Sequence, residues 1–511
     1  MGSRYFFAIV LAVLIGTVSS FAKDYYVSPS GDDSRDGSIS RPWQHIAFAT
    51  CGGSYACSCT VNNPNRITAG DTLFIREGKY SEHDIRMANT GTSAAWIVIK
   101  AYPDEKDTID CQKISSGFNV GTFQTNNYIV MDGLFIKNPL QAGIRIGENY
   151  TGDHLIIKNC RFEGLVQNDN SACVFLSTSN DTRIDNCVMV GSDSTNLNYC
   201  GIQIFRGNGS DTIQHCDISH FAEGIFYKHC SLGYMQTVIR NNFIHDNHAN
   251  GLWISSDQVL MQNNLVVNNG TSGVSIWEDA GGTGGSNSSV LHNTVYNQRY
   301  TMQMNWGGQY DTLTKDHGVR NDTLVNNIFY GNNGELGSYC VWAYAPDSAF
   351  TNNPPDDSSN YNCYYDTATS NVMRWQGTTY TLTNWRVTHP TLDANSIQGA
   401  PTFANVSGMM DSIKDFKLLS GNGYRAASDG MNMGANVDSV GLQGSQTTFI
   451  SDPTRNNRRI FSQFGTQAHC SIFLETHRTA LISGEQVYDI QGQQIRNNQV
   501  RPNGMYVSVK R

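Results

Sequence analysis

Lys228 is the residue whose surroundings point most clearly to chemistry. It lies in the segment Gly224–His229 and follows two aromatic residues directly. Burial among rings disfavours the charged ammonium, so a lysine in this position gives up its proton more readily. A neutral amine can remove a carbon-bound proton next to a carboxylate, provided that a cation stabilises the charge that develops there. Arg206 and Arg145 are the candidate cations. The alternative is a lysine that is simply solvated.

Three acidic residues, Asp257, Glu278 and Asp279, lie in two successive repeats of the chain. Calcium takes several oxygen ligands, and these carboxylates would supply some of them. The same residues would also serve as the paired carboxylates of a glycoside hydrolase. Individually, each is expected to be a turn residue that bonds to backbone. Calcium is therefore the cofactor that this cluster would bind.

Side chains that alternate outward along the predicted strands form two columns. The first column is Arg145, Gln203, Phe226, Trp253 and Ser275, and the second is Gly147, Phe205, Lys228, Ser255 and Trp277. Large rings facing water on a soluble protein mark a ligand surface or a covered one. We expect sugar rings to stack on the aromatic residues Phe205, Phe226, Trp253 and Trp277, with Arg145 and Gln203 as polar neighbours that orient them. The alternative is that a loop within residues 300–400 covers these rings.

A repeat through the middle of the chain positions these candidates. One segment recurs every 22 to 33 residues, with aligned positions at Asn159, Asn186, His215, Asn241, Asn263, Asn293 and Asn326. A second segment of the form Gly-apolar-x-apolar starts at Gly143, Gly201, Gly224, Gly251 and Gly273, and residues 172–176 fill the missing turn. One such coil cannot bury its apolar face alone, but stacked coils can. The repeat therefore predicts a single parallel β-helix.

Stacking puts equivalent residues of successive coils above one another. We expect Asn159, Asn186, Asn241, Asn263 and Asn293 to form one hydrogen-bonded ladder. The aligned residues Cys160, Cys187 and Cys216 are expected to be small buried hydrophobic side chains, because a stacked row does not make a tetrahedral metal site.

The ends of the repeat region carry a family resemblance. The segments 25–33, 41–43, 69–80, 96–103 and 415–418 together resemble pectate-lyase-like right-handed β-helix proteins over residues 24 to about 440. The resemblance implies this fold and a lysine or arginine base, often with calcium, which matches Lys228. Calcium-dependent lyases of this fold often carry an aspartate cluster before that lysine, whereas this chain has Ser219–Glu223 there. Lyases, glycosidases, epimerases and non-catalytic proteins all share the fold.

The two ends of the chain indicate export. Residues 1–22 have a short basic region, an apolar run and a small-x-small cleavage site, which is typical of a signal peptide. Residues 441–478 are expected to be a linker, and residues 479–511 resemble the small β-sandwich sorting domains of type IX secretion cargo. Thirteen cysteines suit an oxidising compartment, and we expect a disulfide in the loop that holds Cys51, Cys57 and Cys59.

The sequence thus predicts an all-β protein, with a right-handed parallel β-helix over 23–440, a linker and a C-terminal β-sandwich. The formal charge of -9 argues against a nucleic-acid partner. We expect an exported or surface-attached monomer without a transmembrane segment in its mature form. Its expected partners are a polysaccharide and, through the C-terminal domain, the secretion machinery. The leading hypothesis is a lyase that cleaves a uronate polysaccharide by β-elimination; the alternatives are a glycoside hydrolase on the same groove and a non-catalytic carbohydrate-binding protein.

Overall fold

The computed structural model describes residues 22–53, 61–147, 149–205, 209–228, 236–276, 285–296, 300–305, 321–331, 339–344, 358–375, 377–405 and 412–443, together with 469–474, 486–489, 494–495 and 505–510 near the end of the chain. The chain divides into two compact units, Met1–Gln443 and Gly444–Arg511. The expected signal peptide therefore lies almost wholly outside the described residues. No helix in the described ranges is long and apolar enough to cross a membrane.

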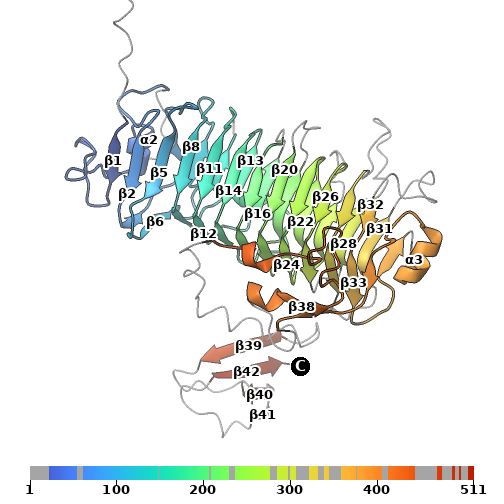
Figure 1. The fold of residues 1–511 in the computed structure, drawn as a ribbon. Coiled ribbons are helices and arrows are strands. Elements are labelled where there is room, and N and C mark those ends of the chain that lie inside the picture. Colours follow the sequence, from blue (N-terminus) through green and yellow to red (C-terminus); the bar gives the residue numbers. More distant parts are fainter. Residues whose placement is uncertain are drawn as a thin grey trace, which may run out of the picture. The chain divides into compact units, whose positions relative to one another are not determined.

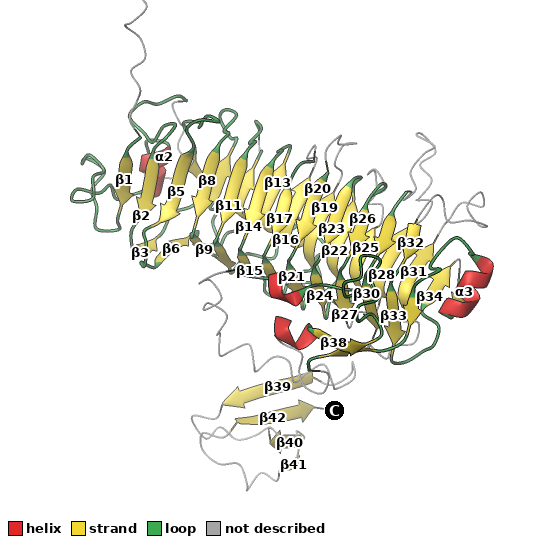
Figure 2. Ribbon diagram, in the orientation of Figure 1, coloured by secondary structure: helices red, strands yellow, loops and turns green. Residues whose placement is uncertain are grey.

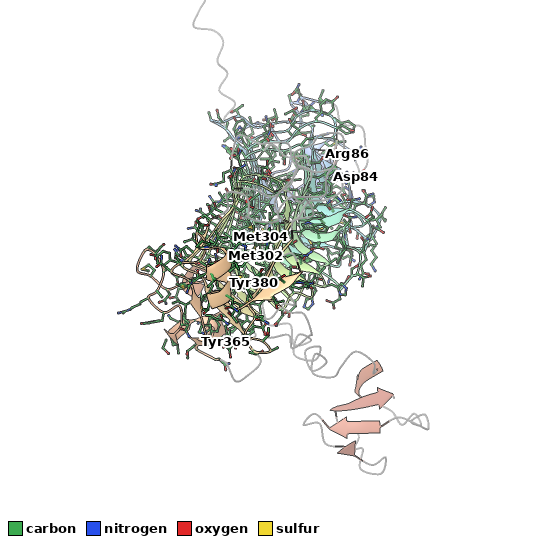
Figure 3. All side chains as sticks on the ribbon, turned by 90° about the vertical axis from the view of Figure 1, so that its right-hand side faces the viewer. Asp84, Arg86, Met302, Met304, Tyr365 and Tyr380 are labelled. Atoms are coloured by element: carbon green, nitrogen blue, oxygen red, sulfur yellow. The ribbon has the colours of Figure 1, made fainter. Side chains whose placement is uncertain are left out.

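The first unit is a parallel β-helix whose stacked coils form three long sheets (Figure 1, Figure 2), which confirms the predicted fold class. Each coil contributes one strand to each sheet in turn. Alternate side chains point inward: in the strand Leu155–Lys158, Leu155 and Ile157 are buried, and Ile157 stacks between Met131 and Ile184 of the neighbouring coils. Along Tyr300–Asn305, Met302 and Met304 are likewise fully buried in the core (Figure 3). Stacking therefore gives each coil the apolar neighbours that it lacks alone.

The strands of the first sheet are all parallel. They are, in order, β1 (Asp24–Val27), β2 (Thr72–Ile75), β5 (Ile97–Ala101), β8 (Ile129–Asp132), β11 (Leu155–Lys158), β14 (Thr182–Asp185), β17 (Thr212–Gln214), β20 (Thr237–Arg240), β23 (Val259–Gln262), β26 (Ser289–Leu291), β29 (Thr323–Val325) and β32 (Ser358–Asn360).

The second sheet follows the first one around each coil. Its strands are β3 (Gly78–Tyr80), β6 (Asp107–Asp110), β9 (Phe135–Lys137), β12 (Arg161–Glu163), β15 (Val188–Val190), β18 (Asp217–Ser219), β21 (Phe243–His245), β24 (Leu265–Val267), β27 (Thr294–Tyr296), β30 (Ile328–Gly331), β33 (Cys363–Asp366) and β36 (Ile397–Gln398).

The third sheet closes each coil and ends in an antiparallel pair, β34 with β35. Its strands are β4 (Ile85–Arg86), β7 (Phe118–Val120), β10 (Ala142–Ile146), β13 (Ser171–Ser177), β16 (Tyr199–Phe205), β19 (Glu223–Lys228), β22 (Asn250–Ser255), β25 (Ser272–Ile276), β28 (Tyr300–Asn305), β31 (Tyr339–Tyr344), β34 (Met373–Trp375) and β35 (Thr378–Tyr380).

The turn between the first and second sheets carries an outer ladder. Its residues have positive φ, a conformation that asparagine tolerates better than most side chains, and they are Asn159, Asn186, His215, Asn241, Asn263, His292 and Asn326. Neighbouring members are hydrogen-bonded in groups: Asn186 Nδ2 donates to Asn159 Oδ1 at 2.7 Å, Asn263 Nδ2 donates to Asn241 Oδ1 at 2.8 Å, and Asn241 Nδ2 donates to His215 Nε2 at 3.1 Å. His215 Nδ1 bonds to Asp185 and not to Asn186. Four of the five predicted asparagines therefore lie in one column, but the hydrogen bonds that join them are interrupted between Asn186 and His215.

Asn293 is the correction to that ladder. Leu291 pairs with Gln262 and with Val325, so His292 occupies the outer position and Asn293 lies one residue further on. There it joins an inner, fully buried ladder made of Asn242, Asn264, Asn293, Asn327 and Asn362. Three of the coils carry two neighbouring asparagines at these positions, which hides this one-residue difference from a sequence alignment.

The inner position is occupied by cysteine in the earlier coils. Cys160, Cys187 and Cys216 are buried free thiols, and burial raises the pKa of Cys187 well above its ordinary value, with its two neighbours adding to the shift. The row is thus part of the core, as predicted. Cys51 is disulfide-bonded; Cys57 and Cys59, the other two cysteines of its loop, lie outside the described residues.

A return segment, described over residues 401–405 and 412–443, packs back along the outer face of the second sheet. It includes β37 (Pro401–Phe403), β38 (Leu418–Gly421) and the 3-10 helices η2 (Ile413–Phe416) and η3 (Val437–Ser439). Its apolar residues share one cluster with outward side chains of the second sheet, including Phe243, Leu265 and Tyr296. It also forms hydrogen bonds to the outer ladder: the backbone NH of Asn436 donates to Asn263 Oδ1 at 2.6 Å, and that of Gln443 donates to Asn186 Oδ1 at 2.6 Å.

Two short helices flank the coils. At α2 (Ile46–Thr50), the buried Glu82 carboxylate accepts from the backbone NH groups of Ile46 and Ala47, each at 2.9 Å. Near the other end, α3 (Leu382–Thr388) begins at Thr381, whose side chain accepts from the NH of Asn384. These caps satisfy backbone donors that the helices leave open.

The second unit contains a four-stranded antiparallel sheet. Its strands are β39 (His469–Leu474), β42 (Met505–Lys510), β40 (Gln486–Asp489) and β41 (Gln494–Ile495). β39 falls inside 441–478, the range expected to be a linker, and residues 441–443 are bound to the β-helix through Gly441 and Gln443.

Candidate functional site

The outer face of the third sheet brings most of the described candidates into two straight columns. Strand register places the first column as Arg145, Phe175, Gln203, Phe226, Trp253, Ser275 and Gln303. The second column is Ser177, Phe205, Lys228 and Ser255. Apart from Gly147, which no strand pairing includes, and Trp277, which lies outside the described residues, the predicted members of both columns are in register, and the structure adds Phe175, Ser177 and Gln303. The alignment missed Phe175 because Cys173 stands where the other coils have glycine.

Two of the predicted ligand contacts are covered rather than open. Phe226 is only 1% exposed and Gln203 is 0% exposed, whereas Phe205, Trp253, Arg145 and Lys228 are half-buried. Trp253 stacks on Phe226 with ring centroids 4.4 Å apart, because side chains in register on adjacent parallel strands are spaced at about the distance of a ring stack. Phe205 and Trp253 are thus the rings of these two columns that can contact a ligand directly.

Lys228 is held in place at the second column. Its Nζ lies 5.0 Å from the centre of the Phe226 ring and donates to Asn198 Oδ1 at 3.1 Å. Asn198 Nδ2 in turn donates to Asp169 Oδ1 at 2.7 Å. Asn198 precedes β16 and contacts the lysine from the preceding coil, and Asp169, which precedes β13, contacts Asn198 from the coil before that. Sequence reasoning missed both, since asparagine and aspartate are common in turns and nothing in the pattern singles them out.

Arg145 lies on the first column, three strands away from Lys228, which lies on the second. Its guanidinium lies 4.7 Å over the Phe175 ring, and its buried Nε has no hydrogen-bond partner among the described residues. Strands β10 and β19 are separated by β13 and β16, and Lys228 lies two residues beyond Phe226, the residue of β19 in register with Arg145. The backbones of Arg145 and Lys228 are therefore about 16 Å apart. The structure therefore does not bring Arg145 to the atoms that Lys228 would reach. Arg206, the other candidate cation, lies outside the described residues.

Glu223 is a buried acid on the same face that the sequence did not indicate. It stands in register between Cys200 and Asn250, and its Oε2 accepts from the NH of Asn250 at 3.1 Å. Its Oε1 has no hydrogen-bond partner among the described residues. Complete burial raises the pKa of Glu223 well above its usual range, which favours the protonated acid. Glu223 is the first residue of β19, and the sequence pattern at the start of a strand does not indicate whether a side chain is buried.

The predicted metal ligands are not assembled by the described part of the chain. Asp257 Oδ1 accepts from the NH of Ser286 at 2.8 Å, which is a turn role. Glu278 and Asp279 lie outside the described residues, as does Trp277. Within the described ranges, no group of three or more His, Cys, Asp or Glu side chains is placed to hold a metal ion. Calcium binding stays a prediction.

The other two faces differ from this one. The return segment covers part of the second sheet, as described above. The first sheet carries ion pairs between neighbouring coils, such as Lys158 with Asp132 at 3.3 Å, and within a strand, as between Arg183 and Asp185. Arg240 Nε donates a hydrogen bond to Gln214 of the neighbouring coil at 2.9 Å. At the N-terminal end of the third-sheet face, Asp84 and Arg86 lie side by side, 2.7 Å apart (Figure 3). The stretch from Arg145 to Trp253 therefore combines rings, a lysine and unsatisfied polar atoms.

Comparison with known proteins places the fold. A family model described as the right-handed β-helix region matches residues 121–297. Pectate lyase PEL9 of Emericella nidulans is 33% identical over 106 residues, which are 20% of this chain and only 22% of that enzyme. The uncharacterized protein YwoF of Bacillus subtilis is 22% identical over 413 residues, 65% of this chain and 82% of that protein. The crystal structure of pectate lyase Pel9A superposes with a TM-score of 0.50 at 13% identity, covering 83% of this chain and 97% of that one. The chain is thus a right-handed β-helix protein with the fold of a pectate lyase.

Proposed function

We propose that the protein is a polysaccharide lyase that cleaves a uronate-containing chain by β-elimination on the outer face of the third sheet. The observation that carries this proposal is the placement of Lys228. Its amine is half-buried, lies against the Phe226 ring and is fixed by Asn198, beside the half-exposed ring of Trp253. The similarity to pectate lyases in fold supports the same reading without deciding it.

In the proposed reaction, the neutral amine of Lys228 removes the proton at C5 of a uronate. The electron pair left on C5 forms the C4–C5 double bond, and the bond from C4 to the glycosidic oxygen breaks. That oxygen takes a proton from solvent or from a nearby acid, so no oxidant or further reactant is needed. The negative charge that develops on the adjacent carboxylate needs a cation close by.

Arg206 is the better candidate for that cation. It directly follows Phe205, which is in register with Lys228, whereas Arg145 lies on the other column, about 16 Å away. Calcium, held in part by Asp257, Glu278 and Asp279, is the alternative source of positive charge. Activity that survives a chelator, with loss in Arg206→Ala, would favour arginine over metal.

The test is incubation with polygalacturonate, alginate and glycosaminoglycans. Elimination leaves a double bond that absorbs ultraviolet light, so absorbance that rises with new chain ends supports the proposal. New reducing ends without absorbance would mean hydrolysis, for which Asp257, Glu278 and Asp279 would be the candidate carboxylates. Binding with neither product would make the protein a carbohydrate-binding module and overturn the proposal.

We also propose export through a signal peptide at residues 1–22, as a monomer, with residues 479–511 acting as a type IX sorting module. The apolar N-terminal run and the separate C-terminal unit support this assignment. Deletion of residues 479–511 should leave the protein in the periplasm. Normal surface delivery of the shortened chain would contradict the sorting role.

A further inference from the structure

We propose that Asn198 and Asp169 are positioning residues that aim the amine of Lys228 at its substrate. The inference rests on the proposed function, in which Lys228 is the base. It adds a defined hydrogen-bond chain: Lys228 Nζ donates to Asn198 Oδ1 at 3.1 Å, and Asn198 Nδ2 donates to Asp169 Oδ1 at 2.7 Å. The three side chains come from three successive coils of the third sheet.

Asp169 fixes which way the Asn198 amide faces. An ionised carboxylate only accepts hydrogen bonds, so it must receive the NH₂ end of the amide. The amide oxygen is then turned to Lys228. Asp169 is itself restrained, since Asn170 Nδ2 donates to its Oδ2 at 2.9 Å. The orientation of Asn198 is therefore set by chemistry and not by the choice between two equivalent flips.

An amide oxygen suits a lysine that must work as a base. It accepts an N–H from the ammonium, more strongly, and also from the neutral amine, so it holds Nζ in both states. In the neutral amine one N–H stays on Asn198, and the lone pair is directed elsewhere. A carboxylate in the same place would instead favour the charged ammonium and remove the base.

The charged and titratable groups around Lys228 fit this arrangement. On its own strand, Glu223 is buried and its pKa is raised well above its ordinary value, so the protonated acid is favoured. On β16, burial raises the pKa of Cys200 well above its ordinary value, which keeps the thiol neutral. On β22 and its turn, the register neighbour Ser255 is uncharged and Asp257 bonds to Ser286. The Asp169 carboxylate contacts Asn198 and not Lys228, so the Asn198 amide stands between the two.

The experiment uses the full-length protein and three variants. Asn198→Asp puts a carboxylate against the ammonium, Asn198→Ala removes the hydrogen bond, and Asp169→Asn frees the amide to flip. Asp181→Asn is the matched control, because Asp181 is an exposed aspartate in another turn, paired with His154. Two readouts are taken: kcat and KM against pH on the uronan that the wild type cleaves, and the titration of Lys228 by NMR of the reductively methylated protein, assigned by its absence in Lys228→Arg.

We expect Asn198→Asp to move the NMR titration and the alkaline rise of kcat upward by about one pH unit or more. Asn198→Ala and Asp169→Asn should lower kcat by about 10- to 100-fold while KM stays near the wild-type value. The control should match the wild type. Unchanged titration and kcat in Asn198→Asp would overturn the inference even if the wild type is an active lyase. A wild type that cleaves no uronan, with the NMR shift still present, would instead overturn the proposed function and leave the hydrogen-bond chain in place.

Discussion

The inner asparagine ladder and the outer face of the third sheet treat polar side chains in opposite ways. In the ladder, each buried amide bonds to the next coil: Asn264 Nδ2 donates to Ile239 O at 2.8 Å and its Oδ1 accepts from Asn242. On the face, Arg145 Nε, Gln203 Oε1, Glu223 Oε1 and Asn250 Oδ1 are buried and have no partner among the described residues. Unmade hydrogen bonds in a buried place cost stability. The difference separates buried side chains that hold coils together from buried side chains on this face whose hydrogen-bonding capacity is partly unused.

The strongest test of the face is Lys228→Ala. Loss of a general base should lower kcat by about 100- to 10,000-fold, while binding should survive because Trp253 is still present. Lys158→Ala, on the first sheet, is the matched control and should leave kcat unchanged. Full activity in Lys228→Ala on a confirmed substrate would remove the lysine from the mechanism.

The ladder should respond in stability instead. Asn264→Ala leaves the backbone carbonyl of Ile239 and the Oδ1 of Asn293 short of a donor, so the free energy of unfolding should fall by about 2–4 kcal/mol. Urea unfolding followed by circular dichroism measures this. Asn321→Ala, an exposed asparagine bonded to Asn287, should change it by under about 1 kcal/mol. Equal losses in the two variants would mean that burial does not distinguish the ladder.

Trp253→Ala tests whether the face binds sugar rings. Loss of one stacking ring should weaken binding of an oligosaccharide by about tenfold or less, and raise KM more than it lowers kcat. Isothermal titration calorimetry in the Lys228→Ala background measures binding without turnover. Unaltered affinity would place the ligand on another face.

Asp211 also has a buried oxygen without a hydrogen-bond partner among the described residues, but it does not belong to the outer face of the third sheet. Burial raises its pKa to about 8; its Oδ1 accepts from the NH of Thr182 at 2.9 Å, and its Oδ2 has no partner among the described residues. Because the folded pKa lies above the unfolded value of about 3.9, the native state is most favoured at low pH, and that stability is lost as pH rises from about 4 towards 8.

Asp211→Asn keeps the acceptor and removes the charge. It should therefore raise the free energy of unfolding at pH 8 by at least about 1 kcal/mol and have little effect at pH 4. Thermal unfolding at the two pH values checks this. Destabilisation at both would mean that the carboxyl makes a contact that an amide cannot.

The sequence alone determined that the chain forms repeated coils and which side chains of each strand point outward. Period-two alternation within strands, and one equivalent position per coil, are local properties, so the outward columns with Lys228 and Trp253 and the buried row of cysteines could be predicted. Only the tertiary structure decided which of two neighbouring asparagines enters the inner ladder, because strand pairing across Leu291 sets that register. It also decided that Phe226 is covered by Trp253. Finally, it brought Asn198 and Asp169 to Lys228 across 30 and then 29 residues of chain, since contacts between coils depend on the length and path of each loop and not on any pattern within a strand.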